Sequence, residues 1–173
     1  EKLDTVASAR SYAQSLGLDV GDHYTSYVAW EGDRILTTVA ATRAGSVEIT
    51  PFWFPVVGSL PYKGFFDPED AEELANRLRN GGFDVCVSGV AAYSTLGWLD
   101  DPVTTPMLNR DTGPLVEILV HELTHTSVFV AGDADLSESV ATFMGQEASV
   151  GFFEKEDARR RERSRVTDAR RIG

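Results

Sequence analysis

The sequence predicts an α+β fold, with an N-terminal helix and a largely antiparallel sheet followed by a helical half. From Tyr24 to Phe66 the chain is rich in β-branched and aromatic residues, with turn residues between the apolar runs. From Gly113 onward the apolar residues recur at helical spacing instead. A chain of 173 residues is long enough for one core and short for two. We therefore expect one α+β domain spanning residues 1–173.

The first half begins with a helix and continues as short strands. Residues 4–17 keep apolar side chains at helical spacing, and Gly17 is a plausible stop. Turn residues such as Glu31-Gly32-Asp33 divide the next segment and favour antiparallel hairpins. The expected strands are residues 27–30, 35–41, 47–49 and 52–57.

A second helix and a longer strand complete this half. Asp67 followed by Pro68 predicts a helix start, and Gly81-Gly82 a stop. Residues 83–92 then predict a strand with Cys86 in its apolar core. Because Cys86 is the only cysteine, the chain has no intrachain disulfide.

The second half predicts three helices after a loop over residues 97–113. The first runs from Pro114 to Ala131 and stops before Gly132. Asp135 or Ser137 caps the next, which we expect to end at Gly151, and the last begins after Phe153.

Charge and hydropathy exclude some classes of function. The formal net charge is −11, and an acidic body argues against nucleic acid as a partner. The basic run at 159–163 is interleaved with acidic residues and is typical of a solvated helix. No stretch approaches the roughly 20 apolar residues of a membrane span. Since residue 1 is Glu, we expect a mature form or fragment, with any signal peptide or lipid anchor outside it.

The most informative pattern is His121-Glu122-Leu123-Thr124-His125, inside the helix expected at 114–131. An i,i+4 pair places both imidazoles on one helix face, which allows them to bind one Zn²⁺. Glu122 lies beside that face, where it can take a proton from a water at the metal. The alternative is a pair of core histidines bonded to backbone or hydroxyl groups.

A zinc site of this kind needs a third protein ligand, and Glu138 is the favoured candidate. It lies in the first turn of a helix expected to return beside the first one. His23 is the only other histidine, and Glu147 is a fallback on the same helix. In the structural alternative, Asp135 and Glu138 form a capping box. We expect small residues of this helix to face its neighbour (Ala141, Thr142, Gly145 and Ser149) and larger ones to enter the core (Val140, Phe143 and Met144).

Beyond the zinc pattern, several segments resemble a family of bacterial aminopeptidases within the gluzincin type of metallopeptidase. They are Phe54–Gly58, Tyr62–Phe66, Gly89–Trp98, Asp100–Pro102, Glu117–His125 and Ser137–Thr142. The resemblance implies a zincin-like fold, zinc binding by His121, His125 and Glu138, and a general base at Glu122. It also implies a location in the bacterial cell envelope or periplasm. Ser137 replaces the Asn that many relatives have before the third ligand.

The expected reaction is zinc-dependent hydrolysis of a peptide substrate, with aminopeptidase action favoured by the resemblance. Tyr93 is a candidate to stabilise the tetrahedral oxyanion, although it is equally suited to packing at a strand end. A substrate α-amine would need a carboxylate, for which Glu117, Asp133 and Glu147 are candidates. The alternatives are a zinc endopeptidase, a hydrolase of non-peptide amides and a non-catalytic zinc-stabilised binding module.

Overall fold

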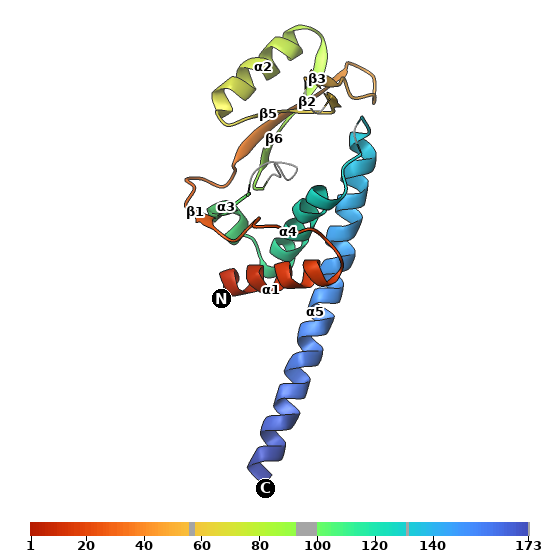
Figure 1. The fold of residues 1–173 in the computed structure, drawn as a ribbon. Coiled ribbons are helices and arrows are strands. Elements are labelled where there is room, and N and C mark those ends of the chain that lie inside the picture. Colours follow the sequence, from red (N-terminus) through yellow and green to blue (C-terminus); the bar gives the residue numbers. More distant parts are fainter. Residues whose placement is uncertain (56–57, 93–99, 131, 173) are drawn as a thin grey trace.

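A computed structural model describes residues 1–55, 58–92, 100–130 and 132–172 (Figure 1), and its mixture of helices and sheets confirms the α+β class. The helices are α1 (Lys2–Ser15), α2 (Pro68–Asn80), α3 (Thr105–Leu108), α4 (Thr112–Ser127) and α5 (Ala134–Ile172). The strands are β1 (Tyr27–Val28), β2 (Leu36–Arg43), β3 (Phe52–Phe54), β4 (Gly58–Leu60), β5 (Lys63–Phe65), β6 (Phe83–Val90) and β7 (Val103–Thr104).

The main sheet has the order β5-β2-β6 and is antiparallel throughout, as predicted. Side chains alternate between its two faces. Val39 of β2 is fully buried and packs with Ala71 and Ala75 of α2, which covers one face (Figure 1). Leu36 and Thr38 lie on the opposite face, toward the helical half. The sheet therefore presents its second face to the site described below.

The helical half contains the larger core. Helix α4 packs against α1 and α5, and Figure 1 shows α1 crossing beside α4 while α5 runs past both. Leu115, Leu119 and Leu123 of α4 are fully buried. Asp67 caps α2 as predicted, accepting a hydrogen bond from the Glu69 N–H at 2.8 Å. Gly17 follows α1 with φ +93°, a conformation that suits glycine and confirms the predicted stop.

Several sequence predictions about the elements are wrong. Residues 47–49 form no strand but contribute one bridge, between Thr42 and Ile49. β1 pairs with β7 in parallel, whereas antiparallel hairpins were predicted for this part of the chain. Cys86 is exposed rather than core. It pairs with Ala40 on the face of the sheet opposite α2, so it is not among the residues that α2 buries.

The end of the chain differs most from prediction. Helix α5 is continuous from Ala134 to Ile172, whereas two helices divided at Gly151 were expected. A Cβ at residue 151 would collide with the Tyr12 hydroxyl, so Gly151 allows α1 to approach rather than ending the helix. Phe143 was expected in the core but is 62% exposed. Helix α4 also ends earlier than predicted, at Ser127.

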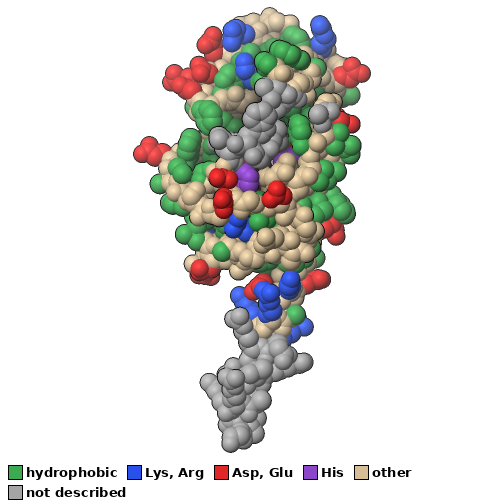
Figure 2. Space-filling model, in the orientation of Figure 1, with side chains coloured by type: hydrophobic (Ala, Val, Ile, Leu, Met, Phe, Trp, Pro, Cys, Tyr) green, Lys and Arg blue, Asp and Glu red, His purple; other side chains and the backbone are tan. Residues whose placement is uncertain are grey.

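Figure 2 shows acidic side chains spread over the body, and basic ones both at the top of the body and in a cluster where α5 leaves it. Among the described residues, no helix combines the length and apolarity that crossing a membrane requires.

Candidate metal centre

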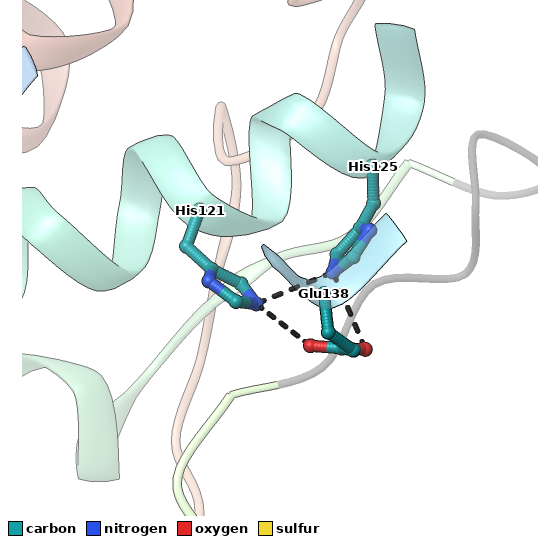
Figure 3. Close-up of side chains that lie close together, drawn as sticks. All are labelled: His121, His125 and Glu138. Atoms are coloured by element: carbon teal, nitrogen blue, oxygen red, sulfur yellow. Dashed lines mark hydrogen bonds and ion pairs between the residues drawn. The ribbon is translucent and has the colours of Figure 1, made fainter. Parts of the chain in front are cut away.

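His121 and His125 lie one turn apart on α4 and turn their rings to the same side (Figure 3). The position of α4 is fixed by its buried apolar residues, which include Leu115, Leu119 and Leu123. His125 is itself buried, and His121 is partly exposed. Their Nε2 atoms are 3.2 Å apart. Two ring nitrogens this close need a shared proton or cation between them, because two lone pairs would otherwise face each other.

The carboxylate of Glu138, on α5, lies beside both imidazoles. Its Oε2 lies 3.4 Å from His121 Nε2, and its Oε1 lies 3.6 Å from His125 Nε2. The alternative capping role does not form, because Asp133 caps α5 by accepting from the Leu136 N–H at 3.0 Å. The Glu138 carboxylate is therefore directed at the two imidazoles and not at the helix end (Figure 3).

The turn between the two helices is fixed by Ser137, which is 3% exposed. Its hydroxyl accepts a hydrogen bond from the Val130 N–H and donates one to the Asp133 carbonyl, each at 3.0 Å. These bonds tie the chain before α5 to the first turn of α5. Because Ser137 directly precedes Glu138, they also set the start of the helix that positions this carboxylate.

A glycine lets α5 approach α4 beside His121. A Cβ at Gly145 would lie 2.8 Å from the Glu117 carbonyl oxygen and 3.3 Å from His121 Cβ. Any side chain there would push the helices apart. Ala141 on the same side of α5 is also buried, so the prediction is confirmed at Ala141 and Gly145, while Ser149 is only partly buried. Ala148, which was not predicted, is buried there as well. Thr142, expected within this small-residue contact, is exposed.

The three side chains lie close enough together to hold one metal ion. Ligand atoms at about 2.1 Å from a zinc ion in tetrahedral geometry are separated from one another by roughly 3.4 Å. The two Nε2 atoms are 3.2 Å apart, and each lies 3.4 or 3.6 Å from a different oxygen of the Glu138 carboxylate. One ligand atom from each of the three side chains lies within 4.8 Å of the others. Two imidazoles and one carboxylate also match the donor set of catalytic zinc sites, which leave the fourth position open. Within the described part of the chain, these three side chains form the group able to hold a metal.

Glu122 lies beside the centre and is only 8% exposed. Burial raises the pKa of its carboxyl group to about 7, although the nearby His121 opposes the shift. The charges of Glu138 and Asp101 raise it further. In contrast, hydrogen bonds from His121 and His125 lower the pKa of Glu138 to about 2. The two carboxyl groups thus differ in pKa. The higher pKa of Glu122 suits a group that accepts and releases a proton, and the lower pKa of Glu138 suits a ligand that stays charged.

These residues face a cavity of about 410 Å³ between the sheet and the two helices. Figure 2 shows histidine side chains (purple) reaching the surface in the middle of the body. The described lining comprises Leu36, Thr38, Leu60, Tyr62, Val90, Ala92, His121, Glu122, His125, Phe129, Ala134, Ser137 and Glu138.

Sequence reasoning missed Tyr62 as a residue of this cavity. Burial raises the pKa of its hydroxyl group, and the charges of Glu138 and Glu122 add to the effect. The phenol is therefore protonated at neutral pH and close to both carboxylates. Tyr62 belongs to one of the segments that resemble the family, but the sequence pattern did not indicate its role, because only the folded sheet places it in the cavity.

Other sequence candidates lie elsewhere. His23 is buried away from the cluster, and its Nδ1 accepts a hydrogen bond from the Asp101 N–H at 3.2 Å. Glu147 is exposed on α5 and outside the cluster. Neither Glu117 nor Asp133 lines the described part of the cavity. Tyr93 falls outside the described residues.

The match of a family model places the chain among known proteins. A model for the family "Putative aminopeptidase" matches residues 1–172. The chain belongs to this family. Comparisons with curated proteins and with solved structures found no match.

Proposed function

We propose that the protein hydrolyses peptide bonds in a zinc-dependent reaction, with His121, His125 and Glu138 holding one Zn²⁺. The observation that supports this most strongly is the convergence of three side chains whose ligand atoms all lie within 4.8 Å of one another. Membership of an aminopeptidase family supports peptides as the substrate class. The pattern is that of the gluzincin type, in which the third ligand is a glutamate on a following helix.

The proposed mechanism assigns proton transfer to Glu122. A bound zinc ion supplies Lewis acidity, which lowers the pKa of water to about 7 and polarises the scissile carbonyl. Glu122 accepts a proton from the attacking water and delivers it to the leaving amine. Its pKa of about 7 suits both steps at neutral pH. Glu138 remains charged and completes the ligand set.

A hydrogen-bond donor for the developing oxyanion completes the proposal. Tyr93 is the candidate from sequence, and Tyr62 is a second candidate because it lines the cavity. Phenylalanine at the true donor should lower kcat by roughly 10²–10³ with KM little changed. Comparing Tyr62→Phe with Tyr93→Phe therefore assigns the role, and equal full activity of both variants would exclude both tyrosines.

A second candidate function is endopeptidase action with the same machinery. In the described lining, the only carboxylates are Glu122 and Glu138, which the mechanism already uses. An aminopeptidase needs an anionic group for the substrate α-ammonium. Cleavage of free aminoacyl-coumarins against N-acetylated peptides of the same sequence separates the two. Activity on blocked peptides alone removes the aminopeptidase assignment.

The decisive experiment compares the wild type with Glu122→Gln. The variant should lose at least about 10²-fold in kcat because the proton acceptor is gone. It should retain zinc by elemental analysis because no ligand is changed. Full activity of Glu122→Gln would contradict the mechanism. If the wild type binds zinc but hydrolyses neither peptides nor other amides, the protein is instead a zinc-stabilised binding module. From the family resemblance we also propose a location in the bacterial envelope, which fractionation of cells tests.

A further inference from the structure

The wall of the cavity opposite the metal centre is apolar. Leu36 of β2 and Val90 of β6 are cross-strand partners on the sheet face that points away from α2. Leu60 of β4 and Phe129, which follows α4, extend the same lining. The cavity therefore has two chemically different sides. One side contains the proposed ligands and Glu122, and the other contains mostly aliphatic and aromatic carbon, with the uncharged hydroxyl groups of Thr38 and Tyr62.

The charges of the cavity are all on the metal side. Its described lining contains no Lys, Arg or Asp, and its two glutamates are the ligand Glu138 and the buried Glu122. The stretches outside the described residues, at 56–57, 93–99, 131 and 173, also contain no Asp, Glu, Lys or Arg. They can therefore bring no charged side chain to this wall.

A charged substrate side chain would be disfavoured on physical grounds. An anionic side chain would enter beside Glu122 and Glu138 and find no Lys or Arg. A cationic side chain would lose hydration against Leu36 and Leu60, and the carboxylates in the described lining of this cavity, Glu122 and Glu138, are already used. An apolar side chain meets neither cost and removes apolar surface of both partners from water.

We propose that this cavity selects substrates with an uncharged, apolar side chain next to the hydrolysed bond. The cavity of about 410 Å³ lies within the usual range of about 300–1,000 Å³ for small-molecule pockets. Leucine, valine or phenylalanine is the side-chain class that fits these walls. This inference rests on the proposed function, because it concerns the substrate of the same centre.

The primary test maps cleavage of a mixed peptide library by the zinc-loaded protein using mass spectrometry. Apolar residues should be enriched at one of the two positions flanking the cleaved bond. In matched peptides, leucine at that position should exceed lysine or glutamate by at least about tenfold in kcat/KM. An equal or greater rate for the charged peptides overturns the inference while leaving hydrolysis itself established.

Paired variants connect the preference to the wall. Leu60→Glu places a charge in the cavity and should reduce the leucine-to-lysine ratio at least tenfold. Ser59→Glu adds the same charge to the exposed face of the same strand and should leave the ratio unchanged. Phe129→Ala tests the wall without adding charge, and should lower the leucine rate more than the alanine rate. Unchanged ratios in both wall variants, confirmed as folded by circular dichroism, contradict the assignment.

A binding measurement separates this inference from the proposed function. The metal-free chain is titrated with N-acetyl-leucine amide, N-acetyl-lysine amide and N-acetyl-glutamate amide while ¹H–¹⁵N spectra are recorded. Perturbations at β2, β4 and β6 with the leucine compound alone support the apolar wall even if no peptide is cleaved. Equal perturbation by all three, or none by the leucine compound, overturns it whatever the zinc content and turnover.

Discussion

His121 Nε2 and Glu138 Oε2 lie 3.4 Å apart although they belong to different helices, α4 and α5. The contact requires the turn at Ser137, the close approach at Gly145 and an early helix position for the glutamate. None of these features is needed for an ordinary surface ion pair, which contributes little to stability. The proposed metal centre accounts for all three features.

Removing the third ligand should weaken zinc binding. Glu138→Ala leaves only the two imidazoles, so the affinity should fall by more than the roughly 10–100-fold that follows loss of an outer partner. Competition with a chelator, followed by elemental analysis, measures the change. Glu147→Ala removes an exposed glutamate of the same helix and should bind zinc as the wild type does. Equal affinities for the two variants would exclude Glu138 as a ligand.

Ser137→Ala should affect both stability and metal binding. The substitution removes the bonds to the Val130 N–H and the Asp133 carbonyl at a buried site, which costs about 1–2 kcal/mol in the free energy of unfolding. Because the turn then holds Glu138 less firmly, zinc affinity should fall by roughly tenfold. Urea titration and chelator competition measure the two effects. The exposed Ser139→Ala should change neither.

Gly145→Ala should separate the two helices. The new Cβ would lie 2.8 Å from a backbone carbonyl oxygen, which cannot move without shifting α4. Overpacking of this kind costs about 1–3 kcal/mol, against a gain of about 1 kcal/mol in helix propensity. We expect a lower melting temperature and weaker zinc binding. Gly113→Ala, with no atom within 4 Å of its Cβ, should be neutral or slightly stabilising. A stable, zinc-binding Gly145→Ala protein would contradict the packing argument.

The metal-free protein should show a pH dependence that comes from Glu122. Its carboxyl group titrates near 4.5 when unfolded and near 7 when folded, so the folded state holds the proton between these values. The free energy of unfolding therefore falls as pH rises from about 4.5 to about 7, by at most about 3 kcal/mol. Glutamine cannot ionise, so Glu122→Gln should lack this part of the decline. Urea titrations of both metal-free proteins at pH 5 and pH 8 measure the difference. Parallel declines would contradict the burial of Glu122 as the cause.

The fold class and the α4 pair followed from local patterns. The i,i+4 spacing of His121 and His125 within one helix needs only helix geometry. Glu138 could be proposed from its distance along the chain, but its actual direction depends on Asp133, which caps the helix in place of Asp135. A local pattern does not decide between two neighbouring caps, because both satisfy the same preference.

The errors arise where tertiary contact overrides local preference. Gly151 was expected to end a helix, yet it lies inside α5, where its lack of a side chain leaves room for the Tyr12 hydroxyl group of α1. Cys86 was placed in the core because its strand is apolar, but which face of β6 is covered depends on the position of α2. Tyr62 lies in the cavity because of the positions of β4 and β5, which the sequence does not predict. Such features depend on contacts with other elements of the folded chain, and the residue spacing within one segment does not predict those contacts.

The proposed metal centre and the wall opposite it come from separate parts of the sequence, which affects how substitutions can change the protein. The proposed metal ligands and Glu122 all lie between positions 121 and 138, on α4 and the start of α5. Most of the opposite wall comes from strands before position 91. Substitutions in those strands can therefore change the substrate selectivity without altering the residues of α4 and α5 that form the proposed centre. Selectivity and chemistry are separately adjustable because they belong to different halves of the polypeptide.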